Sequence, residues 1–208
     1  CLFVDEKIES SSKWHLDDVR VIVLDGVTGQ IKKQEAPTAL RNCDGFSNGE
    51  LRIPNYVHQR LLIADLTGGG PRDFVMKLGE TILACSCELE VLWTYRSPWN
   101  EYPHHAAYIP CVGDIDGDGR DEVVGGHFCL DHDGTPLWER YLGDNMDSVV
   151  IEDWLSAPGE QQAIVSAGGR VLDRWGNEIL AMGMEEVPHG QEIRCGRYHG
   201  GEAAGTRT

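Results

Sequence analysis

The residues with the clearest chemistry lie in one short stretch, Asp114–Glu122, which reads DIDGDGRDE. Acidic residues occupy its first, third, fifth and ninth positions, and glycines its fourth and sixth. A hard cation such as Ca²⁺ takes about six to eight oxygen ligands, so a short loop must aim several carboxylates at one point while its glycines turn the backbone. A solvated acidic turn is the alternative. The pattern favours a Ca²⁺ site formed by the carboxylates of Asp114, Asp116, Asp118 and Glu122 and the carbonyl of Arg120.

A second group of reactive side chains precedes this loop, in the stretch YPHHAAY at 102–108. Histidine titrates near neutral pH and tyrosine can donate or accept a proton, so together they suit proton transfer. We therefore predict acid or base roles for His104, His105 and Tyr108. Alternation along an extended strand places His104 on the side of Tyr108 and His105 on the other side. Structural, hydrogen-bonded histidines and a transition-metal site are the alternatives.

Both stretches belong to an internal repeat of roughly 40–50 residues, a period typical of β-propeller blades. Paired apolar runs joined by a turn predict β-hairpins at 20–33, 81–95, 126–140 and 169–180. The last three hairpins each follow another strand pair, split by a turn at 65–73, 114–122 or 153–160. In the first of these turns, Thr67 and Gly69 replace the third and fifth acidic residues. Each repeat thus reads as one four-stranded blade.

The predicted fold class is all-β, a single β-propeller domain over residues 1–208 with about three and a half to four blades. The blades are expected at 20–56 (incomplete, with a loop insertion at 36–56), 57–97, 104–142, 145–182 and 189–208 (incomplete). Residues 1–19 have no clear place in the repeat. Closed propellers typically have about four to eight blades, so we expect the remaining blades to belong to a longer chain.

Composition excludes some classes of function. The sequence has 18 Lys and Arg against 34 Asp and Glu, a net charge of −16, which argues against a nucleic-acid partner and gives little long-range attraction for polyanionic sugars. No apolar run approaches the roughly 20 residues of a membrane span. Seven cysteines without a C-x-x-C pair are expected to be core or free thiols.

Aligning the repeats on their acidic turns predicts a ring of polar side chains. Near the start of each innermost strand, where propeller strands converge on the central channel, lie Gln59, Tyr108, Asp147 and Gln191, with Asn145 and His189 two residues earlier. Ordinary polar residues at strand ends are the alternative. Trp99 lies in a loop just before the histidines and is our candidate for stacking on a sugar ring. We expect Trp93, Trp138 and Trp175, which lie in or near hairpins, to wedge between blades.

The loop DxDGDGxDE followed by VVGG, LDHDG and LWER resembles the FG-GAP or VCBS repeats of β-propellers. Within that group, residues 57–200 most resemble the rhamnogalacturonan lyases and related lyases acting on rhamnose–uronate links. Repeats of those lyases begin with a Gly-His-Gly-Asp-like segment. His189-Gly190-Gln191 is similar with Gln for Asp, and the segment at 142–147 is similar with Asn145 for His. These departures leave the exact substrate open.

The resemblance implies a polysaccharide lyase that cleaves rhamnose–uronic acid linkages by β-elimination, with an extracellular or periplasmic location. Its substrate would be a polysaccharide or oligosaccharide containing rhamnose and uronic acid. His189 would then join the catalytic group, and Arg194 would be the cation that neutralises the developing enolate-like charge. The Ca²⁺ would be structural, because the loop supplies enough oxygens to enclose it. The alternative function is a non-catalytic, calcium-stabilised propeller that binds glycans or protein partners.

Overall fold

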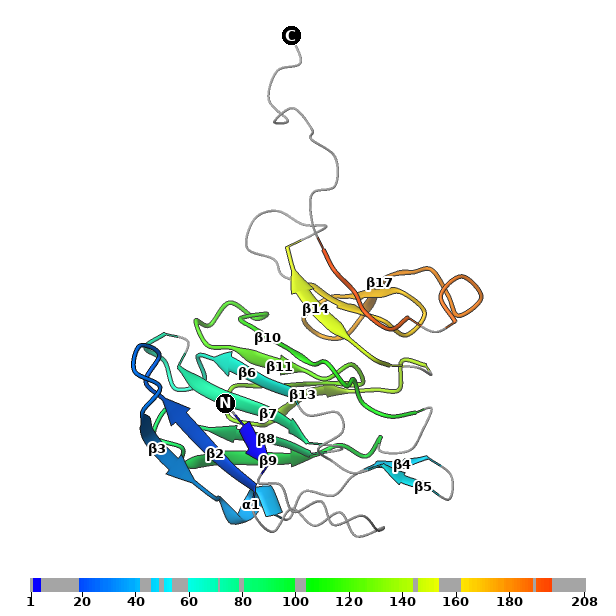
Figure 1. Cartoon of the computed structure of the whole chain (residues 1–208). Helices are drawn as coiled ribbons and strands as arrows, with labels where there is room; N and C mark the ends of the chain where they lie inside the picture. The colour runs from blue at the N-terminus through cyan, green and yellow to red at the C-terminus, as the bar shows by residue number, and fades with distance from the viewer. Residues whose placement is uncertain are drawn as a thin grey trace.

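The computed structural model describes residues 2–4, 19–41, 46–48, 51–53, 60–70, 72–78, 81–99, 104–143, 146–153, 162–188 and 190–195. Its architecture is all-β, as predicted, with three four-stranded antiparallel sheets that follow one another along the chain (Figure 1). The first sheet contains β6 (Arg60–Ala64), β7 (Asp73–Leu78), β8 (Thr81–Cys85) and β9 (Val91–Arg96). The second contains β10 (Cys111–Gly113), β11 (Glu122–Val124), β12 (Phe128–Leu130) and β13 (Pro136–Glu139). The third contains β14 (Val149–Glu152), β15 (Gln162–Val165), β16 (Arg170–Leu172) and β17 (Glu178–Ala181).

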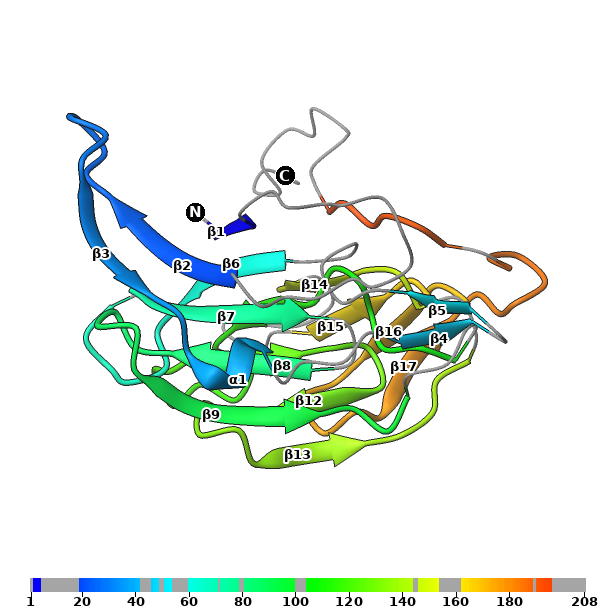
Figure 2. The same ribbon diagram turned by 60° about the horizontal axis from the view of Figure 1, so that its bottom comes forward.

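Each sheet is a meander in which neighbouring strands in sequence are neighbours in space. The first strand is the innermost one, because β10 contacts both β6 and β14. In Figure 2, β6 and β14 lie along one side of the array, and β9 and β13 lie along the opposite side. This order places the acidic turn of each blade directly after its innermost strand.

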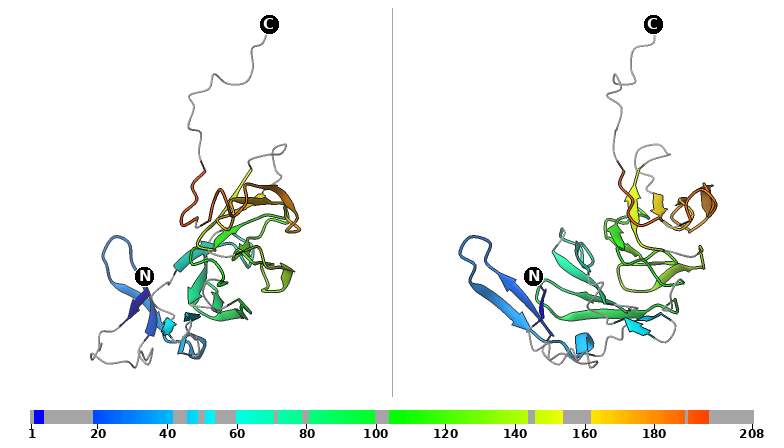
Figure 3. Two further views of the ribbon diagram at one scale, coloured as in Figure 1. Left: turned by 90° about the vertical axis from the view of Figure 1, so that its right-hand side faces the viewer. Right: turned by 45° about the vertical axis from the view of Figure 1, so that its right-hand side comes forward.

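Apolar side chains pack between consecutive sheets. Val75 and Ile82 of the first sheet share one core cluster with Phe128 of the second. Val124 of the second sheet shares another cluster with Val165 of the third. Strands that carry buried side chains on both faces, such as β11, are sandwiched between neighbouring blades. Blade-on-blade packing therefore supplies the core (Figure 3).

The same tryptophan contact joins consecutive blades at two places, where the indole of one blade meets a hairpin turn of the next. We refer to each of these contacts as a joint. The indole N–H of Trp93 donates to the carbonyl of His132 (2.8 Å), and that of Trp138 donates to the carbonyl of Arg174 (3.1 Å). A glycine of the receiving turn, Gly134 or Gly176, lies so close to the indole that a β-carbon there would clash. The predicted wedging of Trp93 and Trp138 is thus confirmed. The same prediction was wrong for Trp175, which is 63% exposed in a turn.

The N-terminal part forms a smaller sheet, β1 (Leu2–Val4), β2 (Val19–Leu24) and β3 (Ile31–Glu35), in that order. Residues 1–19 had no predicted place in the repeat, but β1 pairs with β2. The predicted long loop at 36–56 contains a one-turn helix, α1 (Thr38–Arg41), and a hairpin of β4 (Phe46–Asn48) and β5 (Leu51–Ile53). Burial of Leu40 against Val21 holds α1 to β2 of the N-terminal sheet, a tertiary contact that local propensity does not report.

The cysteines agree with the composition argument. Those described, Cys85, Cys87, Cys111, Cys129 and Cys195, are all free thiols. Burial raises the pKa of the Cys85 thiol to about 11, so this group is inert at neutral pH. Among the described residues, none forms a helix of the length and apolar character needed to cross a membrane.

Candidate functional site

The turn between β10 and β11 gathers carboxylates as the spacing predicts. Carboxylate oxygens of Asp114, Asp116 and Glu122 lie within 4.8 Å of one another. Backbone amides wrap around Asp114, whose Oδ1 accepts from Gly117 (2.7 Å) and whose Oδ2 accepts from Gly119 (3.0 Å). Both glycines have positive φ values, +85° and +90°, a conformation that side-chain-bearing residues rarely adopt. The glycine spacing therefore shapes the turn that brings the acids together.

Glu122 carries the strongest indication of a bound cation. Its side chain is fully buried, and its Oε2 accepts the backbone N–H groups of Ile115 (2.8 Å) and Asp116 (3.2 Å). Its Oε1 is buried without a hydrogen-bond partner in the described part of the chain. Burial, followed by the nearby Asp116 charge, raises the pKa of Glu122 to about 8. An unpartnered buried carboxylate beside two further carboxylates fits a hard divalent cation, which would supply the missing partner and the missing positive charge.

The fifth and seventh positions of the loop contribute to a neighbouring cluster. Asp118 groups with Asp131 and His132, whose ligand atoms also lie within 4.8 Å of one another. The Arg120 guanidinium lies 2.7 Å from His132 Nε2. Arginine can only donate, so Nε2 accepts and the imidazole proton resides on Nδ1, 2.6 Å from Asp131 Oδ1. This network makes His132 part of the joint between the acidic turn and the next hairpin.

The histidine segment is not a strand, and this changes its pairing. Residues 104–108 are irregular, and β10 begins only at Cys111. The His105 ring stacks on Tyr108, with centroids 4.1 Å apart and planes 17° apart. His104 instead approaches Tyr141 at the far end of the blade, with 2.6 Å between Nδ1 and the hydroxyl oxygen. The predicted alternation, with His104 beside Tyr108 and His105 opposite, was therefore wrong.

Two residues that sequence reasoning undervalued complete this aromatic–histidine cluster. His127 is fully buried between Trp99 and Tyr141, with ring centroids 5.2 and 5.1 Å away. Its Nδ1 accepts the N–H of Leu142 (3.1 Å), so its proton is on Nε2. Burial, then the charges of His105 and His104, lowers the pKa of His127 to about 3, which keeps this ring neutral. His127 follows a Gly-Gly pair and Tyr141 follows β13, and neither position carries a local sequence signal for this cluster.

The members of the predicted polar ring are only partly placed. The segments that carry Tyr108, Asp147 and Gln191 lie side by side: Ile109 and Ser148 form a bridge, and Ser148 Oγ accepts the N–H of Ile193 (3.0 Å). Gln191 is exposed and Asp147 is partly buried. Trp99 is partly buried and packs on His127, so one side of its ring is already covered. Gln59, Asn145 and His189 lie outside the described residues.

Arg194 is exposed and forms an ion pair with Glu192, two residues away. This contact lowers the net positive charge that Arg194 can offer to a substrate carboxylate, and a solvent-exposed pair of this kind contributes little stability. Its predicted role as the neutralising cation remains a prediction.

Comparisons with known proteins add a fold relationship. No family model matches the chain. A stretch of 61 residues, 26% of this chain and 10% of the relative, is 39% identical to rhamnogalacturonan exolyase YesX of Bacillus subtilis (strain 168). The solved exotype rhamnogalacturonan lyase YesX aligns with a TM-score of 0.58 and 20% identity over 79% of this chain and 30% of that one. Rhamnogalacturonan lyase YesW aligns with a TM-score of 0.60 and 18% identity over 84% of this chain and 32% of that one. Bacillus licheniformis rhamnogalacturonan lyase PL11 aligns with a TM-score of 0.56 and 21% identity over 78% of this chain and 30% of that one.

At these identities the structural alignments establish the fold alone. The chain spans about a third of the length of the solved relatives it matches. Its three four-stranded sheets therefore correspond to part of a larger β-propeller. The chain resembles, in fold and over a short stretch of sequence, the propeller of the rhamnogalacturonan lyases.

Proposed function

We propose that this chain is part of a calcium-stabilised polysaccharide lyase that cleaves rhamnose–uronic acid linkages by β-elimination, outside the cell or in the periplasm. The observation that carries the proposal is the aromatic–histidine cluster of the second blade, in which His104 meets Tyr141 and His105 stacks on Tyr108. The similarity to proteins described as rhamnogalacturonan lyases supports the choice of substrate class.

The reaction needs a base, an acid and a neutralising group. The base removes the proton from the carbon next to the uronate carboxylate, the bond from the neighbouring carbon to the glycosidic oxygen breaks, and a carbon–carbon double bond forms. The departing oxygen takes a proton from the acid. Charge that develops on the carboxylate during proton removal must be stabilised by a cation or by strong hydrogen-bond donors.

The exposure of each side chain supports a division of roles within the cluster. His104 is exposed and Tyr108 is partly exposed, so both are placed to reach a substrate. A His104 tautomer whose Nδ1–H donates to the Tyr141 oxygen leaves Nε2 with a lone pair, the form required of a base. Tyr108 then serves as the proton donor to the leaving oxygen. His105 is only 2% exposed and acts on the orientation of Tyr108 through the stacked rings.

The proposed Ca²⁺ has a structural role and takes no part in the reaction. Asp114, Asp116, Asp118, Glu122 and the Arg120 carbonyl would hold Ca²⁺ in the turn at the opposite end of β10 from the histidines. Bound Ca²⁺ would neutralise the buried Glu122 carboxylate and fix the turn. Asp147 and Gln191 are proposed to contact the sugar, together with Asn145 and Gln59, and His189 is proposed to join the catalytic group.

The test is the ultraviolet absorbance of the unsaturated uronate that β-elimination creates, measured with pectin, ulvan and gum arabic. We expect absorbance to rise with one of these polymers and His104→Ala to abolish the rise. His132→Ala is a matched control, since His132 lies at the other end of the blade and should leave the activity within a few-fold. Because the chain covers about a third of its solved relatives, the measurement should also be made on the protein with all of its blades. No rise with any polymer from that protein would reject the lyase assignment.

The net charge of −16 favours a second candidate, a non-catalytic propeller that binds glycans or proteins, because an acidic surface repels uronate polymers. This function predicts binding to immobilised polysaccharide without any rise in absorbance. The rise and its loss in His104→Ala therefore separate the two functions.

A further inference from the structure

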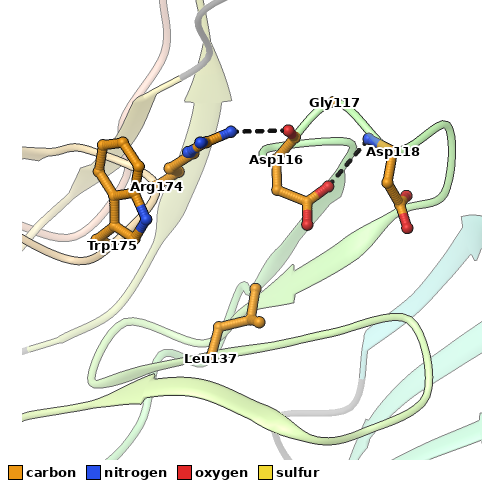
Figure 4. Close-up of a pocket in the computed structure, with 6 residues that line it drawn as sticks. All are labelled: Asp116, Gly117, Asp118, Leu137, Arg174 and Trp175. Carbon is orange, nitrogen blue, oxygen red and sulfur yellow. Dashed lines mark hydrogen bonds between the residues drawn. The ribbon is translucent and has the colours of Figure 1, made fainter.

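A pocket lies at the joint between the second and third blades, at the acidic-turn end of β10 and so away from the histidines. Its volume is about 330 Å³. Its described lining residues come from three places: Asp116, Gly117 and Asp118 of the β10–β11 turn, Leu137 of β13, and Arg174 and Trp175 of the β16–β17 turn (Figure 4). Trp175 and Leu137 keep 63% and 42% of their surface exposed.

The turn that carries Trp175 is held firmly in place. The Arg174 carbonyl accepts from the Trp138 indole, and the Arg174 guanidinium donates to the Asp116 carbonyl (2.9 Å). Asp173 Oδ1 accepts the N–H groups of Trp175 (3.0 Å) and Asn177 (2.8 Å). The indole is therefore presented on a backbone fixed before any ligand arrives, which reduces the entropy lost on binding.

Packing does not explain a tryptophan at this position. In the preceding joint the equivalent turn is Asp131-His132-Asp133-Gly134, and Trp93 fixes it through the His132 carbonyl in the same way. The residue equivalent to Trp175 is Asp133, which only caps its own turn by accepting the N–H of Thr135 (2.9 Å). The joint thus forms without an indole at this position. Trp175 and Leu137 together give the pocket an exposed apolar wall that blade packing does not use.

The lining chemistry selects the ligand. Trp175 and Leu137 offer apolar surface to the C–H face of a sugar ring. The carboxylates of Asp116 and Asp118 belong to the proposed Ca²⁺ site, so they are not counted as sugar ligands. The Arg174 guanidinium is already engaged, since it lies 4.3 Å from the centre of the Trp175 ring and donates to the Asp116 carbonyl. The described lining offers a sugar carboxylate no cationic side chain other than this engaged guanidinium, which favours a neutral sugar over an anionic one. We propose that this pocket is a binding subsite for a neutral pyranose unit, separate from the proposed catalytic cluster.

The experiment follows the indole N–H resonance of Trp175 by ¹⁵N NMR in calcium-containing buffer, with the peak assigned by its loss in Trp175→Phe. The probes are methyl α-L-rhamnopyranoside and methyl β-D-galactopyranoside, with a galacturonic acid trimer as the anionic comparison. We expect a saturable shift of this resonance with at least one neutral glycoside and a weaker response to the trimer.

Two variants make the result specific. Trp175→Ala should weaken binding of the responding glycoside, followed by ligand-observed NMR, about tenfold through loss of the stacking surface. Asp133→Ala, the equivalent position one blade earlier, should leave the affinity within about twofold. Both variants should keep the dispersed amide spectrum of the folded chain, because neither side chain is buried.

Three results would overturn the proposal: no shift of the Trp175 resonance with either neutral glycoside, unchanged affinity in Trp175→Ala, or a stronger response to the trimer than to the glycosides. A shift on adding Ca²⁺ with no further change on adding sugar would also overturn it, because the pocket would then be only the surroundings of the metal. The measurement does not depend on cleavage, so failure of the lyase assignment leaves this proposal standing.

Discussion

The turns Asp65–Asp73 and Asp114–Glu122 close the same pair of inner strands in adjacent blades, and each buries its last acid completely. In the first turn, Asp73 Oδ2 accepts from Leu66 N–H (3.2 Å), Thr67 N–H (2.9 Å) and the Thr67 hydroxyl (2.8 Å). Its Oδ1 accepts from Cys87 N–H (3.2 Å). The buried carboxylate of the first turn is therefore satisfied by the protein itself.

The second turn repeats the backbone contacts but not the side-chain donor. Glu122 Oε2 accepts from the N–H groups of Ile115 and Asp116, as Asp73 does from Leu66 and Thr67. The third position is now a carboxylate, Asp116, which cannot donate and repels Glu122. Glu122 Oε1 has no partner among the described residues. Both oxygens of the last acid in the first turn thus have protein partners, whereas one oxygen of the last acid in the second turn has none among the described residues. The first turn keeps an unpartnered buried oxygen at a different place, Asp65 Oδ1.

The two turns also touch, which ties the proposed cation site to the preceding blade. Asp65 N–H donates to Asp121 Oδ2 (2.7 Å), and Asp121 N–H donates to the Asp65 carbonyl (2.8 Å). Burial raises the pKa of Asp121. A cation at Asp114–Glu122 would therefore steady the joint between blades as well as its own loop.

The change with the largest expected effect is Glu122→Gln. Loss of the buried carboxylate should weaken Ca²⁺ binding by roughly a hundredfold or more, measured by isothermal titration calorimetry. The metal-free variant should also be more stable than the metal-free wild type at pH 8. In the wild type the unfolded chain loses the Glu122 proton near 4.5 while the folded chain keeps it to about 8, so stability falls by up to about 1.4 kcal/mol per pH unit between them.

The matched control for this change is Asp73→Asn in the first turn. It should lower stability, because an amide nitrogen would face backbone N–H donors, yet leave Ca²⁺ affinity within about threefold. Equal loss of Ca²⁺ affinity in both variants would contradict the difference between the turns.

Thr67→Asp should make the first turn resemble the second. The new carboxylate cannot donate to the buried Asp73 and adds a like charge beside it at an exposed position, which should cost about 1–3 kcal/mol in chelator at neutral pH. Chemical denaturation with and without Ca²⁺ is the measurement, and Ca²⁺ should restore part of the loss. A variant as stable as the wild type in chelator would show that the hydrogen bond from the Thr67 hydroxyl to Asp73 does not stabilise the turn.

Ca²⁺ affinity of the wild type should depend on pH. Glu122 must lose its proton before it can bind the cation, and its pKa in the metal-free protein is raised to about 8. Affinity should therefore fall by up to about tenfold for each pH unit below 8. Calorimetry at several pH values would check this, and a flat profile between pH 6 and 8 would show that Glu122 is already ionised without metal.

The smallest expected effect is that of Thr67→Val. Removal of the hydroxyl leaves Asp73 Oδ2 with two backbone donors, so the variant should lose about 1 kcal/mol of stability and no Ca²⁺ affinity. Thermal unfolding in chelator is the measurement. A Ca²⁺-dependent change in this variant would argue that the first turn also binds the cation.

Much of this structure could be predicted from the sequence because the informative residues are local. The acid and glycine spacing at 114–122 predicts the turn, and alternating apolar runs predict the three blades, since both depend on neighbours in the chain. The loss of acids at Thr67 and Gly69 was also readable, although nothing local shows that the Thr67 hydroxyl would bond to Asp73.

The contacts that could not be predicted are those between distant segments. Strand alternation failed for His104 and His105 because the segment flanked by Pro103 and Pro110 is irregular. Tyr141 meets His104 only once the blade has folded. Trp175 has the hairpin setting of Trp93 and Trp138, but it lies in the turn itself rather than on the strand that leads to the next blade, and so remains exposed.

The decisive experiment is a Ca²⁺ titration of the wild type and Asp116→Thr, which gives the second turn the hydroxyl of the first. We predict that the wild type binds Ca²⁺ and gains stability from it. Asp116→Thr should lose at least about a hundredfold in affinity, because one charged ligand is gone, while in chelator it should be more stable than the wild type, because the introduced hydroxyl can donate to Glu122. Equal Ca²⁺ affinity in both proteins, or no Ca²⁺ binding by the wild type, would contradict the assignment of the cation to this turn.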